Sequence, residues 1–272
     1  MYQDDKGNYQ RTEAEEHVFW GMRLLKIAFI LLIIGFAAYF IESIFELTRG
    51  LEYTTINPVY DLINSPRNYV ATAIFLTIYS SLFTVAIFVL SFGALYLSKM
   101  LPDPVKKELK INGMLFLTLI PIRLIGQIIR YSLYTNYSYG GSIGITMASA
   151  YITFAVNVLE FLFLVIIAIK MGKELRRMNE MQQGKNGTIA MPWILFAMFM
   201  IWLIGSIMFS VIVSIEGYSF QLRDVILAAI YVEGIGQILY SATVIGTFII
   251  LLIKANKIAI SPLAAMNYHT YY

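Results

Sequence analysis

Apolar residues dominate six stretches of the chain, and polar residues gather in the short segments between them. The six stretches are Leu24–Leu47, Val70–Leu97, Ile111–Tyr134, Ile143–Ile169, Ile189–Ile215 and Val225–Ile253. An α-helix needs about twenty predominantly apolar residues to cross the hydrocarbon core of a bilayer. The pattern therefore predicts an all-α, polytopic membrane protein with six transmembrane helices.

The six stretches differ in how strongly they predict a transmembrane helix. The second and fifth contain no charged residue. The third is interrupted by Arg123 and Arg130, and Pro121 is expected to kink it. The third stretch is therefore the weakest of the six predictions.

Composition supports a lipid environment and excludes several kinds of chemistry. The chain is 58% hydrophobic and only 14% charged, whereas soluble domains carry about a quarter of charged residues. It has no cysteine, which excludes disulfides, thiolate metal sites and iron–sulfur clusters. Its two histidines, His17 and His269, lie outside the apolar stretches. We therefore expect no metal, no cofactor and no nucleic-acid partner.

The basic residues lie mainly on one side of the predicted spans. Three, Arg49, Arg67 and Arg223, fall in segments on the opposite side. The others, which lie outside the spans or at the start of the first span, are Lys6, Arg11, Arg23, Lys26, Lys99, Lys106, Lys107, Lys110, Lys170, Lys173, Arg176, Arg177, Lys185, Lys254 and Lys257. An excess of lysine and arginine marks the cytoplasmic side. The distribution predicts that both termini are cytoplasmic, and we expect the plasma membrane of a prokaryote.

The chain divides into short ends and two groups of three spans. Residues 1–23 form a polar N-terminal segment, 24–134 and 143–253 each contain three spans, and 254–272 form a C-terminal tail. Thr12 and Glu15 fit a helix-capping box. Ala14, Val18 and Met22 then share one helical face. This segment is either an amphipathic helix on the membrane surface or an extension of the first span.

Two short motifs recur in the two groups of spans. The pattern F-A-x-x-x-(I/L)-E-x-(I/L)-F occurs at 36–45 and again at 154–163, and I-G-Q-I-(I/L) occurs at 125–129 and 235–239. Three spans per group would make equivalent helices cross in opposite directions, which is the inverted-topology repeat of many transporters. Chance matches between abundant apolar residues are the alternative interpretation.

Ionisable and amide side chains inside spans are costly and are functional candidates by default. The candidates for a substrate or ion pathway are Glu42, Arg123, Gln127, Glu160, Glu233 and Gln237. In the repeat alignment Arg123 is equivalent to Glu233, which suggests a buried ion pair between them. The alternative is that such a pair, with the two glutamines, only holds helices together.

Two hypotheses from different classes follow. In the first, the chain is a small secondary transporter or channel for an unidentified solute or ion, with the candidate residues around a central site. In the second, it is a non-catalytic subunit that packs against other membrane subunits or a second copy. An enzyme ranks third, because no phosphate-binding glycine loop or hydrolase motif is present in the spans. The bilayer is the partner common to all three.

Overall fold

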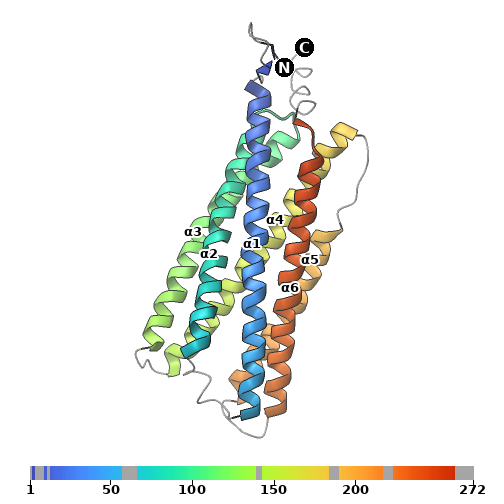
Figure 1. Cartoon of the computed structure of the whole chain (residues 1–272). Helices are drawn as coiled ribbons and strands as arrows, with labels where there is room; N and C mark the ends of the chain where they lie inside the picture. The colour runs from blue at the N-terminus through green and yellow to red at the C-terminus, as the bar shows by residue number, and fades with distance from the viewer. Residues whose placement is uncertain are drawn as a thin grey trace. The chain divides into compact units, whose positions relative to one another are not determined.

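The computed structural model is a set of long α-helices. It describes residues 2–3, 9–10, 13–56, 66–138, 143–183, 190–216 and 223–260. The helices are α1 (Glu13–Ile56), α2 (Pro66–Ser98), α3 (Val105–Ser138), α4 (Ile143–Gln183), α5 (Met191–Glu216) and α6 (Arg223–Lys257), and Figure 1 shows them coloured along the chain. Two-residue strands, β1 (Tyr2–Gln3) and β2 (Tyr9–Gln10), pair antiparallel before α1 and were not predicted.

Five of these helices are long and apolar enough to cross a membrane. The spanning segments are Glu13–Phe45, Ile74–Ser98, Val105–Gly126, Phe154–Gln182 and Tyr231–Lys257. In α5 the described side chains form a shorter apolar segment, Pro192–Met208. The protein therefore has the helices of a multi-pass membrane protein, and the sixth span stays a prediction.

Several helices continue beyond the apolar stretches that predicted them. α1 begins at Glu13 and runs without a break through the predicted first span. Its early residues Ala14, Val18 and Met22 are buried against protein. α4 likewise continues to Gln183, and Leu175 within that extension is buried. These ends remain helical because they carry a buried apolar face, even though their other faces are charged.

The residues group into two compact units that draw segments from both halves of the sequence. Unit 1 comprises Met1–Ile30, Thr84–Ile189 and Ile250–Tyr272, and unit 2 comprises Leu31–Phe83 and Ala190–Ile249. Unit 1 thus contains the whole of α3 and α4. The predicted division into two groups of three spans follows the chain instead, and the inverted repeat stays a prediction.

Glycines set the close helix contacts of unit 1. A Cβ on Gly21 of α1 would lie 2.6 Å from Leu97 Cγ of α2, and one on Gly93 of α2 would lie 3.2 Å from the Gly21 carbonyl oxygen. On α3, a Cβ on Gly113 would lie 2.7 Å from Leu95 Cγ. Only a residue without a side chain allows backbones to approach so closely, and small residues are the usual means of packing transmembrane helices.

α3 and α4 of unit 1 pack antiparallel along a long seam. Glu108 near the start of α3 pairs with Lys173 of α4, and Arg123 further along α3 pairs with Glu160, which lies earlier in α4. Gly126, further along α3, faces Val156 of α4. We call the polar residues of this contact the α3–α4 seam. They are Glu108, Asn112 and Arg123 of α3, and Glu160, Lys173, Glu174 and Arg177 of α4.

Unit 2 has a core of packed aromatic rings, which we call the aromatic cluster. Its centre is Tyr240 of α6, which is fully buried. The centroid of its ring lies 6.3 Å from that of Trp202 of α5 and 6.5 Å from that of Phe36 of α1. Phe36 in turn lies 5.0 Å from Tyr79 of α2 in an edge-on arrangement. The seven rings are Phe36, Tyr39, Tyr79, Phe83, Phe199, Trp202 and Tyr240.

Candidate functional site

One ion pair of unit 1 is almost completely buried between α3 and α4. Arg123 NH1 lies 2.8 Å from Glu160 Oε2, and both side chains are almost fully buried, at 2% and 5% exposure. The Arg123 Nε–H donates to the Thr84 hydroxyl of α2 at 3.0 Å. One guanidinium therefore connects three helices, and its planar set of donors suits such divided bonding.

Helix geometry places this pair well away from Lys110 and Lys170, the basic residues nearest to it toward the start of α3 and the end of α4. Glu160 lies ten residues before Lys170, the next charged residue of α4, and this is about 15 Å along a helix. Arg123 lies thirteen residues after Lys110 of α3, or about 20 Å. The pair therefore lies inside the apolar segments Val105–Gly126 of α3 and Phe154–Gln182 of α4, where an unpaired charge would be costly in a bilayer.

The local sequence explains why Arg123 faces inward. Buried residues on α3 recur every three or four positions, which defines one face of an α-helix. They are Val105, Leu109, Asn112, Phe116, Leu119 and Arg123. Arg123 thus occupies a core position of an otherwise mainly apolar face. A charge at such a position is stable only when it is paired, and Glu160 provides the opposite charge.

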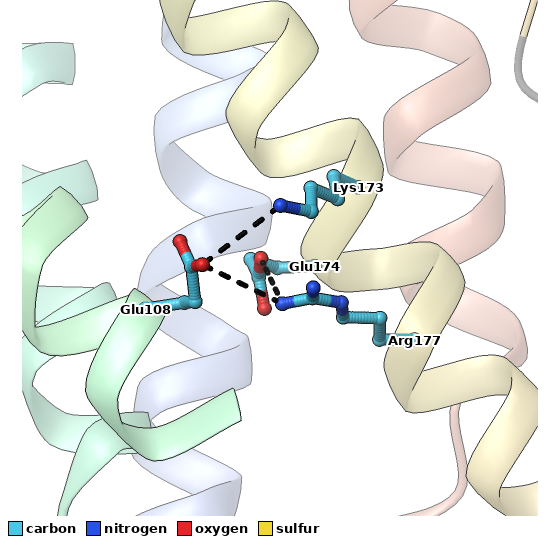
Figure 2. A network of polar contacts seen from close by, with 4 residues as sticks. All are labelled: Glu108, Lys173, Glu174 and Arg177. Atoms are coloured by element: carbon cyan, nitrogen blue, oxygen red, sulfur yellow. Dashed lines mark hydrogen bonds and ion pairs between the residues drawn. The ribbon is translucent and has the colours of Figure 1, made fainter. Parts of the chain in front are cut away.

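A second polar network lies further along the same seam, toward the start of α3. Figure 2 shows Glu108 of α3 directed at Lys173 and Arg177 of α4, with Glu174 beside Arg177. Glu108 Oε1 lies 3.8 Å from Lys173 Nζ and 4.0 Å from Arg177 NH1, which also donates to Glu174 Oε1 at 3.2 Å. The acids and bases balance, so this network holds the ends of α3 and α4 together.

Two fully buried polar residues of the seam were not among the sequence candidates. Both amide atoms of Asn112 and the Oε2 atom of Glu174 are without a hydrogen-bond partner in the part of the chain that the structure describes. Asn112 could have been found from the sequence, because it interrupts the apolar face that leads to Arg123. Glu174 could not, since it lies among several charged residues that the pattern assigns to the surface.

The remaining candidates lie in unit 2 or have undescribed side chains. Glu42 of α1 is buried, and Glu233 and Gln237 of α6 are partly buried. The Ser206 hydroxyl donates to Glu233 Oε1 at 3.5 Å. The side chain of Gln127 lies outside the described residues. The structure thus joins Arg123 to Glu160, whereas the repeat alignment paired it with Glu233. Arg123 and Glu233 belong to different units, and an ion pair between them stays a prediction.

Two polar side chains of α2, Thr84 and Ser91, are hydrogen-bonded in different ways. Thr84 accepts from Arg123, while the Ser91 hydroxyl donates to the Ile87 carbonyl of its own helix at 2.7 Å. Ser91 is therefore satisfied locally and supports close packing. Among the described residues, no group of three or more His, Cys, Asp or Glu side chains could hold a metal ion.

No protein-family model, no curated protein and no solved structure matches the chain, so its function has to be argued from its own residues.

Proposed function

We propose that the chain is a small secondary transporter or channel in which Arg123 and Glu160 lie on the path of a small solute or ion. The single observation that carries the proposal is the ion pair between Arg123 and Glu160, buried between α3 and α4 inside their apolar segments. Ionisable residues inside transmembrane segments mark substrate or ion pathways in many membrane proteins.

The chemistry of the pair suits a carrier with two states. Protonation of Glu160 would remove its negative charge and weaken its hold on Arg123. An anion that reaches the guanidinium would compete with Glu160 for the same donors. Either event changes a contact between α3 and α4, and a change in helix contact is what alternating access requires. Glu42, Gln127, Glu233 and Gln237 are proposed as further residues of the path.

The test is flux through the reconstituted protein. Purified protein in vesicles is assayed for proton, potassium and chloride movement, and wild type is compared with Glu160→Gln. The matched control is Glu180→Gln, because Glu180 pairs with Arg176 one turn away near the end of α4. We expect Glu160→Gln to reduce flux at least tenfold and the control to leave it unchanged. Equal flux in the two variants would remove Glu160 from the mechanism.

The alternative proposal is a non-catalytic subunit of a larger membrane complex. The contact of Arg123 with Thr84 favours it, because an arginine bonded to two neighbouring helices also serves as interhelical glue. Native mass spectrometry of gently extracted protein separates the two proposals. A monomer or small homo-oligomer supports the transporter or channel, whereas a fixed set of different subunits supports the complex.

The proposed orientation has six spans with both termini in the cytoplasm of a prokaryote. The 26 residues of α5 extend about 39 Å, which is long enough to cross the core. Since the chain has no cysteine, a single introduced cysteine is a unique label. Asn256→Cys in the last turn of α6 should react with an impermeant thiol reagent only in opened cells, whereas Thr48→Cys of α1 should react in intact cells. The reverse pattern would invert the orientation.

A further inference from the structure

The first turns of α3 carry three exposed lysines, Lys106, Lys107 and Lys110, which we call the lysine patch. None of the ion pairs among the described residues includes them. The nearest acid along the helix, Glu108, faces α4 and is engaged with Lys173 and Arg177 (Figure 2). The lysine patch therefore presents positive charge that the described part of the protein does not neutralise.

An exposed apolar lane continues directly from the lysine patch along the same side of α3. Lys107 is one turn before Ile111, and Lys110 is one turn before Met114, and these two apolar side chains are 51% and 54% exposed. The lane continues through Ile122, Ile125 and Ile128, which are 46%, 58% and 65% exposed. The helix thus changes at once from cationic to apolar.

Other helices of unit 1 have interfacial residues where their apolar runs end. On α1, Trp20 is 41% exposed, and the Arg23 guanidinium lies 5.1 Å from its ring. On α2, Tyr96 is 37% exposed, and Lys99 Nζ lies 5.2 Å from its ring. Tryptophan, tyrosine and basic residues concentrate at the headgroup level of a bilayer. By the same reasoning, the lysine patch lies at headgroup level and the apolar lane faces acyl chains.

We propose that the start of α3 binds an anionic phospholipid, with the headgroup phosphate on the lysine patch and an acyl chain along the apolar lane. Three features complement such a lipid: ammonium groups that form no ion pair among the described residues, the positive end of the helix dipole, and an exposed surface below them that is apolar except at Thr118. The inference is independent of the transport proposal, because it concerns the exposed side of α3, whereas Arg123 lies on the buried side of this helix.

The test compares lipid retention by the full-length protein in native mass spectrometry. The protein is equilibrated with an equal mixture of phosphatidylglycerol and phosphatidylcholine. Wild type is compared with the pair Lys107→Gln and Lys110→Gln. The matched control is the pair Lys254→Gln and Lys257→Gln, which removes the same charge from the end of α6. The lysines of the patch are exposed, so their substitution leaves the core unchanged.

We expect wild type to prefer phosphatidylglycerol and the patch variant to bind it roughly twenty-fivefold more weakly, at about fivefold for each lysine. The control pair should keep the preference, and inorganic phosphate should not displace the lipid, because the acyl chain contributes to binding. Three results would overturn the proposal: no preference in wild type, equal losses in the two paired variants, or displacement by inorganic phosphate.

Discussion

The α3–α4 seam of unit 1 and the aromatic cluster of unit 2 are two different ways of packing helices inside a membrane. The seam depends on one ion pair in which each charge needs the other, Arg123 with Glu160. The aromatic cluster distributes its contacts over seven rings, and Tyr240 packs against three of them, Phe36 of α1 and Phe199 and Trp202 of α5. Losing one charge of the ion pair should therefore lower the stability of the protein strongly, whereas losing one ring of the aromatic cluster removes only part of its packing.

The largest effect should come from breaking the ion pair on one side. Arg123→Leu or Glu160→Leu alone leaves a buried charge without its partner and should lower the free energy of unfolding by about 4 kcal/mol. The double variant should recover most of that loss, because no buried charge remains. Thermal and denaturant unfolding in detergent micelles gives the four values of the double-mutant cycle. Strictly additive losses would argue that the pair contributes nothing.

The same cycle can separate the structural pairing from the pairing that the repeat suggested. If Glu160 is the partner of Arg123, Arg123→Leu combined with Glu233→Leu should show losses that add. A coupling between Arg123 and Glu233 as large as that with Glu160 would instead support the repeat-based pair.

A smaller effect is expected in the aromatic cluster. Tyr240→Ala removes a fully buried ring and should cost about 3 kcal/mol, because a cavity opens among its neighbours. Tyr240→Phe keeps the ring and should cost only about 1 kcal/mol. Unfolding in micelles measures both. If Tyr240→Phe were as damaging as Tyr240→Ala, the hydroxyl rather than ring packing would control this region.

Close backbone packing should produce the next effect in size. Gly113→Val in unit 1 would bring a Cβ to 2.7 Å from Leu95 Cγ and should cost about 2 kcal/mol by forcing α2 and α3 apart. Gly35→Ala in unit 2 is the control, because its Cβ would meet Leu82 Cβ at 3.4 Å, an ordinary contact. Its Tm should stay the same or rise slightly. An equal loss of stability in the two variants would show that the close approach of α2 and α3 at Gly113 does not control stability.

The smallest effect is expected at the exposed end of the seam. Lys173 is 48% exposed and 3.8 Å from Glu108, so Lys173→Gln should change stability by less than about 0.5 kcal/mol. Arg177→Gln should cost more, about 1 kcal/mol, because it removes the donor to buried Glu174. Tm measured at low and high salt checks both. A larger loss for Lys173→Gln would show that the network of Figure 2 acts as one unit.

A helical, multi-pass membrane protein could be predicted from the order of the residues alone, because the hydrocarbon core of a bilayer requires long apolar segments. The sequence also identified Arg123 and Glu160 as residues inside spans, since any charge there stands out against apolar neighbours. The ends of the helices were less predictable. α1 and α4 extend beyond their apolar stretches because protein contacts, rather than lipid, bury one face of each end.

The partner of each buried charge could not be predicted without the packing of the helices. Arg123 has several acidic candidates in other spans, and helical periodicity gives the face of each residue but not the register between two helices. The antiparallel packing of α3 on α4 selects Glu160 among the acidic residues, because it brings the Glu160 Oε2 atom to 2.8 Å from the guanidinium of Arg123. The burial of Glu174 was equally hidden, because a charged residue in a charged segment is expected at the surface until another helix covers it.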